Sequence, residues 1–133
     1  MKEQFLLDTH IILALVEEQQ DRLPHRIRLA LDKTETPIWV SVMSLWELAI
    51  KSRVGKMSLR TPLQHWPDAL FLLGAQLLAV EFQHIVAEIG TEPATKDPFD
   101  RLLLGVCAAE NFRLVTLDRA LADHPLAWRP FPA

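Results

Sequence analysis

Short apolar runs alternate with longer segments of helical periodicity along most of the chain. The first run, residues 4–8, is too short for a helix and ends on an acid, a pattern typical of a buried strand. Apolar positions then recur at helical spacing over residues 11–16, and Thr9 stands where it can cap that helix. Further strands are predicted at residues 37–41, 77–82 and 113–117, with a weaker edge strand near Trp128 within residues 121–132.

Helical patterns fill the segments between these strands. Ser44-Leu-Trp-Glu47 has the form of a capping box, which predicts a helix from there to about Val54, with Gly55 as its stop. The other predicted helices begin at about Pro24 and span residues 62–76, 85–89 and 97–111. Strands alternating with helices predict an α/β fold, a three-layer α/β/α sandwich with a mainly parallel sheet of four to five strands. No linker or repeat is visible, so residues 1–133 are expected to form a single domain.

Composition excludes several classes of protein. With 133 residues, 50% of them hydrophobic and 23% charged, the chain has an ordinary globular balance. A net charge of -3 excludes a strongly basic nucleic-acid binder of the histone type, although it permits a locally basic surface. The single cysteine, Cys107, excludes an intrachain disulfide and a zinc site built from several cysteines. The most apolar stretch, residues 69–80, is shorter than the ~20 residues of a membrane span, so we expect a cytoplasmic protein with no membrane segment.

Acidic residues fall where the predicted strands and helices meet. Asp8 ends the first strand and Asp118 follows the fourth, whereas Glu47 and Asp100 are expected in the first turns of two helices. The carboxyl ends of parallel strands share one edge of a sheet, and ligand sites lie at that edge. We therefore expect the four carboxylates to lie close together, where they repel one another unless a cation is bound. Oxygen ligands without thiolates favour Mg²⁺ or Mn²⁺.

Each acid also has a purely structural interpretation, which the sequence leaves open. Asp8 and Asp118 can cap the helices that follow them, and Glu47 can close the capping box and pair with Lys51 four residues on. Asp97 precedes Pro98 and is expected to cap the helix of residues 97–111, in which Asp100 stands in the first turn.

Several cations stand next to these acids. Lys96, Arg101 and Arg119 are candidates for binding phosphate groups, with solvated rim charges as the alternative. The basic stretch of residues 51–60 is expected to form a solvated face. His10 is expected to pack near the site or to support it.

Four segments resemble the signature blocks of PIN-domain proteins, most closely the VapC-type toxins of bacterial type II toxin–antitoxin pairs. These segments are Leu6-Leu-Asp-Thr-His10, Ser41-Val-Met-Ser-Leu-Trp-Glu-Leu48, Lys96-Asp-Pro-Phe-Asp-Arg-Leu-Leu103 and Leu114-Val-Thr-Leu-Asp118. They follow the family order and extend from residue 6 to residue 118. The D-P-F-D-R-L-L string is the most specific of the four, and related sequences often carry His where this chain has Thr95.

The resemblance implies a metal-dependent endoribonuclease with a PIN-like fold. Its acidic site would comprise Asp8, Glu47, Asp100 and Asp118, with Thr116 as a hydroxyl near the last acid. Asp97, Arg101 and Thr9 are taken as supporting residues. The implied cofactor is Mg²⁺, or Mn²⁺, and the implied partners are an RNA substrate, a cognate antitoxin protein and a second copy of the chain.

Two other classes of function remain as alternatives. One is a phosphate-handling α/β domain of the phosphatase or receiver type. The sequence Asp8-Thr-His10 lacks the second acid that haloacid-dehalogenase-type phosphatases carry after the first strand. The other is a catalytically silent PIN-like binding module. Metal-dependent RNA cleavage that Asp8→Asn abolishes would separate the enzyme from the silent module.

Overall fold

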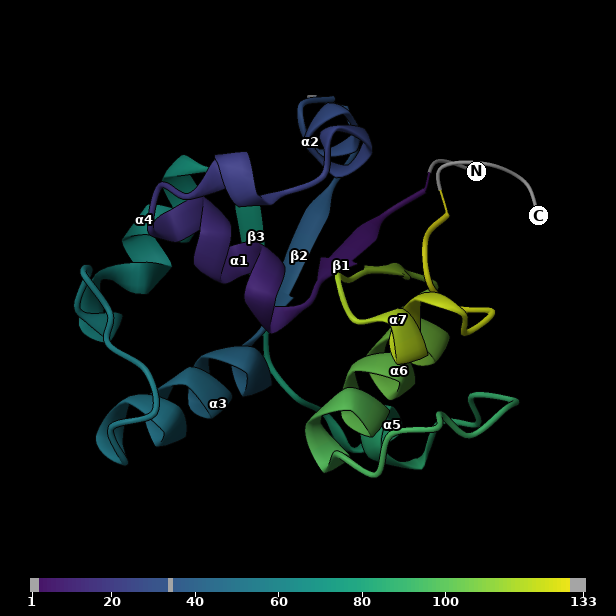
Figure 1. The fold of residues 1–133 in the computed structure, drawn as a ribbon. Helices are drawn as coiled ribbons and strands as arrows, with labels where there is room; N and C mark the ends of the chain where they lie inside the picture. Colours follow the sequence, from purple (N-terminus) through teal and green to yellow (C-terminus); the bar gives the residue numbers. More distant parts are fainter. Residues whose placement is uncertain (1–2, 34, 130–133) are drawn as a thin grey trace.

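The structure is a computed structural model that describes residues 3–33 and 35–129. Within these residues the chain forms a four-stranded, all-parallel sheet in the order β3-β2-β1-β4 (Figure 1). In register, Leu6 of the β1 strand pairs with Trp39 on one side and Leu114 on the other. The strands are β1 (Phe5–Leu7), β2 (Ile38–Ser41), β3 (Ala75–Leu78) and β4 (Arg113–Val115).

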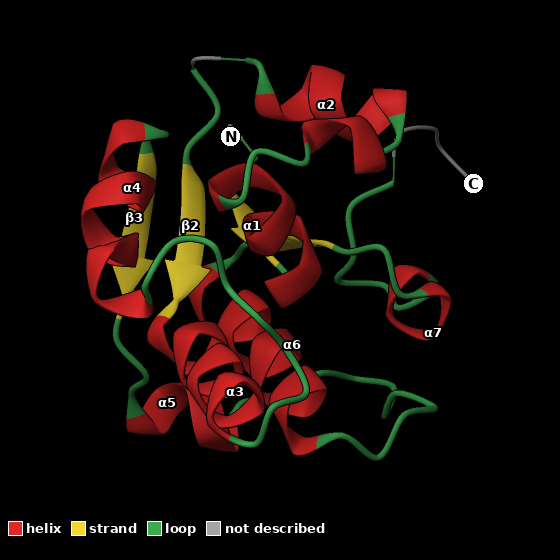
Figure 2. Cartoon of the chain, turned by 60° about the vertical axis from the view of Figure 1, so that its left-hand side comes forward, coloured by secondary structure: helices red, strands yellow, loops and turns green. Residues whose placement is uncertain are grey.

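Helices cover both faces of this sheet, which gives the predicted three-layer α/β/α architecture (Figure 2). The α-helices are α1 (Thr9–Val16), α2 (His25–Leu31), α3 (Val42–Arg53), α4 (Trp66–Leu72), α5 (Phe82–Val86), α6 (Pro98–Glu110) and α7 (Arg119–Ala122). Two short 3₁₀ helices, η1 (Gln20–Arg22) and η2 (Leu63–His65), precede α2 and α4.

Side chains of β1 alternate between two hydrophobic cores, one on each face of the sheet. Phe5 and Leu7 belong to the core shared with α1, α2 and α4, whereas Leu6 belongs to the core shared with α6. The α3 helix contributes to both cores, because Leu48 packs into the first and Met43 into the second. It therefore joins the two helical layers immediately after β2.

Two helices begin earlier than the sequence predicts. Thr9 does not cap α1: Asp8 does, and its Oδ1 accepts a hydrogen bond from the Thr9 N–H. Ser44 does not cap α3 either, because the hydroxyl of Ser41 accepts from the Met43 N–H and the helix starts at Val42. Glu47 is thus the sixth residue of α3 and not part of a first-turn capping box.

The segment from residue 62 to residue 89 is displaced from its prediction. The helix predicted over residues 62–76 is η2 followed by α4, which ends at Leu72 because Gly74 adopts a left-handed φ of 81°. Strand β3 therefore begins at Ala75, two residues before the predicted strand. The next helix, predicted at 85–89, is α5 and begins at Phe82. The uniformly apolar run of residues 69–80 carries no periodicity that could mark these boundaries.

Other boundaries agree with the sequence. Gly55, with φ 78°, ends α3 in a Schellman motif, in which Lys56 N–H donates to Lys51 O at 2.9 Å. The α6 helix runs from the Asp97 cap to a left-handed Asn111, as predicted. The predicted strand at 113–117 is shorter and ends at Val115.

The segment after α7 adds one parallel bridge to the sheet, and this is what remains of the predicted edge strand. Ala127 pairs with Leu114, beside Trp128, whereas residues 130–132 of that prediction lie outside the described residues. Cys107 is fully buried in the second core. Over residues 3–33 and 35–129, every helix is too short or too polar to span a bilayer.

Candidate active site

The strand order reverses between β1 and β4, and we call the region outside the carboxyl ends of these two strands the crevice. From β1 the chain moves outward through β2 to β3 and then returns to place β4 on the opposite side of β1. In open parallel sheets, ligands bind outside the strand ends at such a reversal. Asp8 directly follows β1, and Thr116 directly follows β4. The Asp8 N–H donates to Val115 O at 3.0 Å, which joins the two strand ends.

Asp8 is buried at the centre of this crevice. Its Oδ1 accepts from the Thr9 N–H at 2.7 Å, and its Oδ2 accepts from the Thr116 hydroxyl at 2.6 Å. Burial raises the pKa of Asp8 above its ordinary value, against the opposing effect of these two hydrogen bonds. The charge of His10 lowers the pKa of Asp8, and the charge of Glu47 raises it. His10 therefore lies within electrostatic reach of the crevice.

Thr116 connects Asp8 to Asp118. Its hydroxyl oxygen accepts a hydrogen bond from the Asp118 N–H at 3.0 Å while its proton points to Asp8. Asp118 lies three residues beyond the end of β4, rather than directly after the strand, and caps α7 by accepting from the Ala120 N–H at 2.8 Å. Asp118 thus combines the capping role that the sequence left open with a position at the crevice.

Asp100 reaches the crevice from the first turn of α6. Burial is the largest cause that raises the pKa of Asp100 to about 6, followed by the charges of Asp97 and Asp8. The charge of Asp118 also raises the pKa of Asp100, whereas a hydrogen bond with Thr95 lowers it. Asp97 itself caps α6, because its Oδ1 accepts from the Phe99 N–H at 2.9 Å.

Glu47 is buried in the second turn of α3, and both of its carboxylate oxygens are engaged. Oε1 accepts from the Thr9 hydroxyl at 2.7 Å, and Oε2 accepts from the Lys51 ammonium at 2.8 Å. The pairing of Glu47 with Lys51 four residues on is confirmed. Thr9 thus links Glu47 to Asp8, a role that its position in the sequence did not indicate.

The residues of the crevice fit a divalent cation in donor type and in charge. Asp8, Asp100 and Asp118 offer hard carboxylate oxygens, and the charges of the other two raise the pKa of Asp100. Among the described residues, no three His, Cys, Asp or Glu side chains stand close enough together to hold one ion as placed. Asp8 and Asp118 are instead satisfied separately, by Thr116 and by Ala120.

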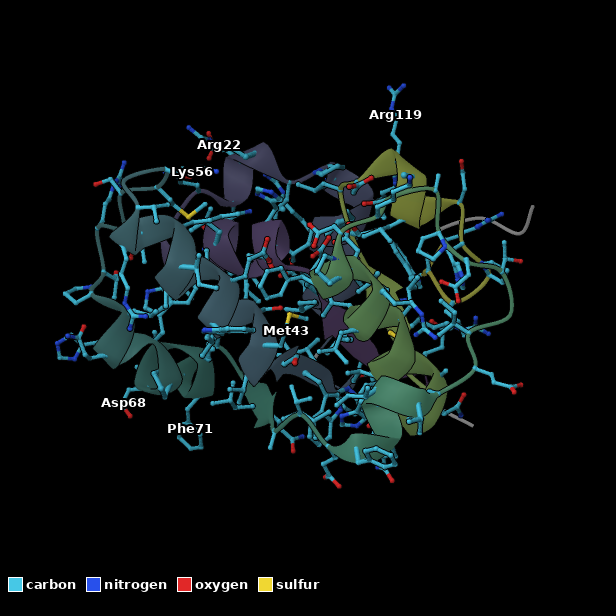
Figure 3. All side chains as sticks on the ribbon, turned by 90° about the horizontal axis from the view of Figure 1, so that it is seen from below. Arg22, Met43, Lys56, Asp68, Phe71 and Arg119 are labelled. Carbon is cyan, nitrogen blue, oxygen red and sulfur yellow. The ribbon has the colours of Figure 1, made fainter. Side chains whose placement is uncertain are left out.

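Two of the three cations predicted near the acids, Arg101 and Arg119, are directed elsewhere. The Arg101 guanidinium donates to Ala87 O at 3.0 Å and lies 3.3 Å from the Glu92 carboxylate, so it holds the loop that precedes α6. Arg119 points away from the ribbon into solvent (Figure 3). An aromatic pair borders the acids instead: Trp46 and Phe99, next in sequence to Glu47 and Asp100, pack edge to face at 5.5 Å.

The sequence did not predict that the hydroxyl of Ser44, close to Glu47 on α3, is buried. The Ser44 hydroxyl is buried on α3 with no hydrogen-bond partner in the described part of the chain. Met43, its neighbour, lies between the ribbons of α3 and α6 in Figure 3. The sequence pattern predicts Ser44 as a helix cap. Because α3 starts at Val42, Ser44 instead lies within the helix.

Comparisons with known proteins agree with this fold. The family model described as PIN domain matches residues 5–125. Among solved structures, the chain is similar to VapBC2 from Rickettsia felis bound to a DNA fragment from their promoter. The TM-score is 0.62 at 19% sequence identity, over 93% of this chain and 95% of that chain. At this identity, the likeness shows the fold. No curated protein matches the chain in a sequence comparison.

Proposed function

The chain belongs to the PIN domain family, whose members are generally nucleases, and we propose that it is a metal-dependent endoribonuclease. The observation that carries the proposal is the placement of Asp8, Asp100 and Asp118 around the strand reversal, and the charges of Asp8 and Asp118 help to raise the pKa of Asp100. These three carboxylates come from three separate elements and are within electrostatic reach of one another at the strand reversal. Such an arrangement is costly without a cation, and it provides a site for one.

Mg²⁺ or Mn²⁺ would be held by Asp8, Asp100 and Asp118. A bound divalent ion supplies a nucleophile at neutral pH and stabilises charge on the phosphate that is attacked. Thr116 fixes the orientation of Asp8 and positions the turn that carries Asp118. Glu47 is the fourth proposed ligand, and its pair with Lys51 would have to open for it to contribute an oxygen.

RNA cleavage by the purified chain tests the proposed reaction. Single-stranded RNA oligonucleotides should be cut internally in the presence of Mg²⁺ or Mn²⁺ and left intact in EDTA. Asp8→Asn should abolish cleavage while circular dichroism shows an unchanged fold, because asparagine still caps α1. Asp21→Asn, which changes an exposed acid in η1, is the matched control and should cleave as the wild type does.

Metal binding can be measured separately from activity. A ligand that binds only the folded state raises stability by about 2.7 kcal/mol when its concentration is 100 times its Kd. Mn²⁺ should therefore raise the melting temperature of the wild type and much less that of Asp100→Asn. A wild-type melting temperature that does not respond to Mn²⁺ would contradict the proposed cation site.

A catalytically silent binding module is the second candidate. The observation that favours it is the engagement of both Glu47 oxygens by Thr9 and Lys51, which leaves Asp8, Asp100 and Asp118 as the remaining carboxylates. A silent module would bind no Mn²⁺ and cut no RNA, so the two preceding experiments separate the candidates.

We further propose that the chain is the toxin of a type II toxin–antitoxin pair and acts in the cytoplasm. The support is the shared fold with the solved VapBC2 complex, which covers nearly the whole of both chains. Expression of the chain alone should arrest bacterial growth, and Asp8→Asn should relieve the arrest. Co-expression of the product of a small neighbouring gene should do the same and should yield a complex on purification.

A second copy of the chain is the other proposed partner. Large apolar side chains are exposed along the edge strand β3 and the helices on either side of it. Phe71 of α4 and Phe82 of α5 are 78% and 76% exposed, so neither side chain belongs to the core of the monomer. We call this surface the β3-edge face; it comprises Phe71, Leu72, Leu77, Phe82, Ile85 and Val86. Figure 3 shows Phe71 pointing away from the ribbon.

A further inference from the structure

An open cavity of about 310 Å³ lies next to the candidate active site. Thr116 forms part of its wall, and the same Thr116 hydroxyl donates to Asp8 at 2.6 Å. A molecule in the cavity would therefore lie one side chain away from the acidic crevice. Figure 2 shows the C-terminal segment running from α7 toward α2, and these three parts of the chain supply most of the lining residues. Its lining includes Arg26, Ile27, Thr116, Asp123, Trp128 and Arg129.

Two arginines and one aspartate, Asp123, line the cavity, so its positive charges outnumber its negative charge. Neither Arg26 nor Arg129 forms an ion pair within the described residues. Arg129 donates one guanidinium N–H to Asp123 O at 2.6 Å, and its remaining N–H groups are available. Both arginines are exposed, and planar guanidinium groups suit the recognition of phosphate oxygens. The cavity can therefore bind an anion near the acids, which would themselves repel one.

Trp128 adds a flat aromatic wall in a fixed position. Its ring packs edge-on against Phe5 with the centroids 5.7 Å apart, and its backbone N–H donates to Leu114 O at 2.8 Å. The side chain is only half-buried, and Trp128 lines the cavity together with Ile27. Aromatic side chains of this kind stack on unpaired nucleobases without demanding a particular sequence.

We propose that this cavity binds one nucleotide of a single-stranded RNA, next to the phosphodiester that the crevice receives. Arg26 and Arg129 contact the phosphate, the base stacks on Trp128, and the Asp123 carboxylate accepts from a base amino group. The inference rests on the proposed ribonuclease function and deepens it by assigning a substrate subsite. Its volume is at the lower end of the range for ligand pockets, which suits one nucleotide better than a peptide helix.

The α2 helix offers a matched pair of variants. Arg26 lines this cavity, whereas Arg28, two residues on and also exposed, lines a different hollow with Leu15 and Leu31. Binding of a fluorescein-labelled RNA oligonucleotide to the full chain is measured by anisotropy in EDTA, over a series of salt concentrations. Arg26→Gln should weaken binding about tenfold and reduce the slope of log K against log salt by about 0.7, the value for one phosphate contact. Arg28→Gln should match the wild type.

Competition identifies the base contact. Nucleoside 5′-monophosphates should displace the labelled RNA at lower concentrations than inorganic phosphate does, because the base adds stacking on Trp128 to the phosphate contacts. Equal displacement by the two would overturn the assignment of the base.

The outcomes distinguish this inference from the function on which it rests. RNA binding and cleavage by the wild type, with Arg26→Gln equal to Arg28→Gln in affinity and salt slope, would overturn the nucleotide site alone. A wild type that neither binds nor cuts RNA would overturn both proposals. Loss of antitoxin binding in Arg26→Gln with unchanged RNA binding would show that the cavity receives the protein partner, which also overturns the inference.

Discussion

Asp97 and Asp100 are the two acids of the D-P-F-D string, but their carboxylates have different roles. Asp97 caps α6 by accepting from the Phe99 N–H. Asp100 is half-buried in the crevice, and burial together with the charges of Asp97 and Asp8 raises the pKa of Asp100. Replacing the carboxylate by an amide preserves a cap, since asparagine and aspartate cap almost equally well, but removes a charged metal ligand.

Amide substitutions should therefore separate the two aspartates. Asp97→Asn should retain most of the RNA cleavage of the wild type, whereas Asp100→Asn should lose it by on the order of 100-fold with the fold intact. Cleavage rates at saturating Mg²⁺ and circular dichroism spectra of both variants check this. The reverse ranking would show that Asp97 is the ligand of the D-P-F-D string.

The raised pKa of Asp100 also predicts how stability depends on pH. In the folded chain Asp100 keeps its proton up to a pKa of about 6, whereas in the unfolded chain it loses the proton near its ordinary value of 3.8. Between these values the folded state binds more protons at Asp100, so the contribution of Asp100 to stability is greatest below pH 4 and falls as the pH rises to 6. Solvent screening of this half-exposed group limits the change to on the order of 1 kcal/mol.

Thermal melts in EDTA from pH 4 to pH 7 measure this dependence. Asp100→Asn should flatten the decline and should be more stable than the wild type at pH 7. Glu88→Gln, an exposed substitution in the loop after α5, should leave the decline unchanged. A wild type whose stability rises over this range, with no change in Asp100→Asn, would show that Asp100 is ionised in the folded state.

The sequence predicted the positions of these side chains better than their contacts. Asp8 and Asp118 were placed from the strands that precede them, and the structure has Asp8 directly after β1 and Asp118 three residues beyond β4. The link from Thr9 to Glu47 joins residues 38 positions apart, and no local pattern could reveal it. The same holds for the fixed Trp128 ring, whose partner Phe5 is at the other end of the chain.

The start of α3 shows why local signals mislead at element boundaries. Ser41 and Ser44 are both capable of capping, and Glu47 at the correct spacing favoured Ser44 in the sequence. The structure ends β2 at Ser41, and this residue caps the helix immediately, so Ser44 and Glu47 turn inward as buried residues. Tertiary pairing of β2 with its neighbours decided the boundary, which local propensity could not.

The α5 helix has five residues and is held in place by α6. His84 is fully buried, and its Nδ1 accepts from the Glu81 N–H at 2.9 Å. Its Nε2 is consequently the protonated nitrogen and donates to Glu110 at 3.0 Å. Gly105 of α6 lies directly beneath, where a Cβ atom would overlap the backbone carbonyl of His84. Glycine is required at this position by close approach rather than by its backbone angles.

Gly105→Ala should therefore destabilise the chain, against the usual preference of helices for alanine. Helix propensity alone would add about 1 kcal/mol of stability. Displacement of α5 by the new methyl group should cost about 1–3 kcal/mol and leave a net loss in urea denaturation. Ala109→Gln, on the exposed side of the same helix, should be nearly neutral. A stabilised Gly105→Ala variant would mean that α5 moves away without cost.

The architecture as a whole followed from the alternation of strands and helices, because parallel strands need crossover connections that cover both faces of the sheet. The order β3-β2-β1-β4 could not be derived in the same way, since the sequence of a short apolar strand does not indicate which strands it pairs with. The exposure of Phe71 was equally hidden, because its segment is apolar enough for either a core or an interface. Only the folded arrangement reveals which apolar residues are left over.

The exposed apolar residues of the β3-edge face lead to a prediction that two copies of the chain associate through it. If the β3-edge face joins two copies, a charge at its centre must be buried without a partner, which weakens association strongly. Phe82→Asp should raise the dimer dissociation constant at least about 30-fold, the equivalent of a 2 kcal/mol hot spot, in sedimentation velocity runs over a concentration series. Leu29→Asp places the same charge at an exposed leucine of α2 and should leave the dimer intact. Phe82 is 76% exposed, so its replacement should have little effect on the folding of the monomer. A wild type that is monomeric at every concentration would contradict the interface.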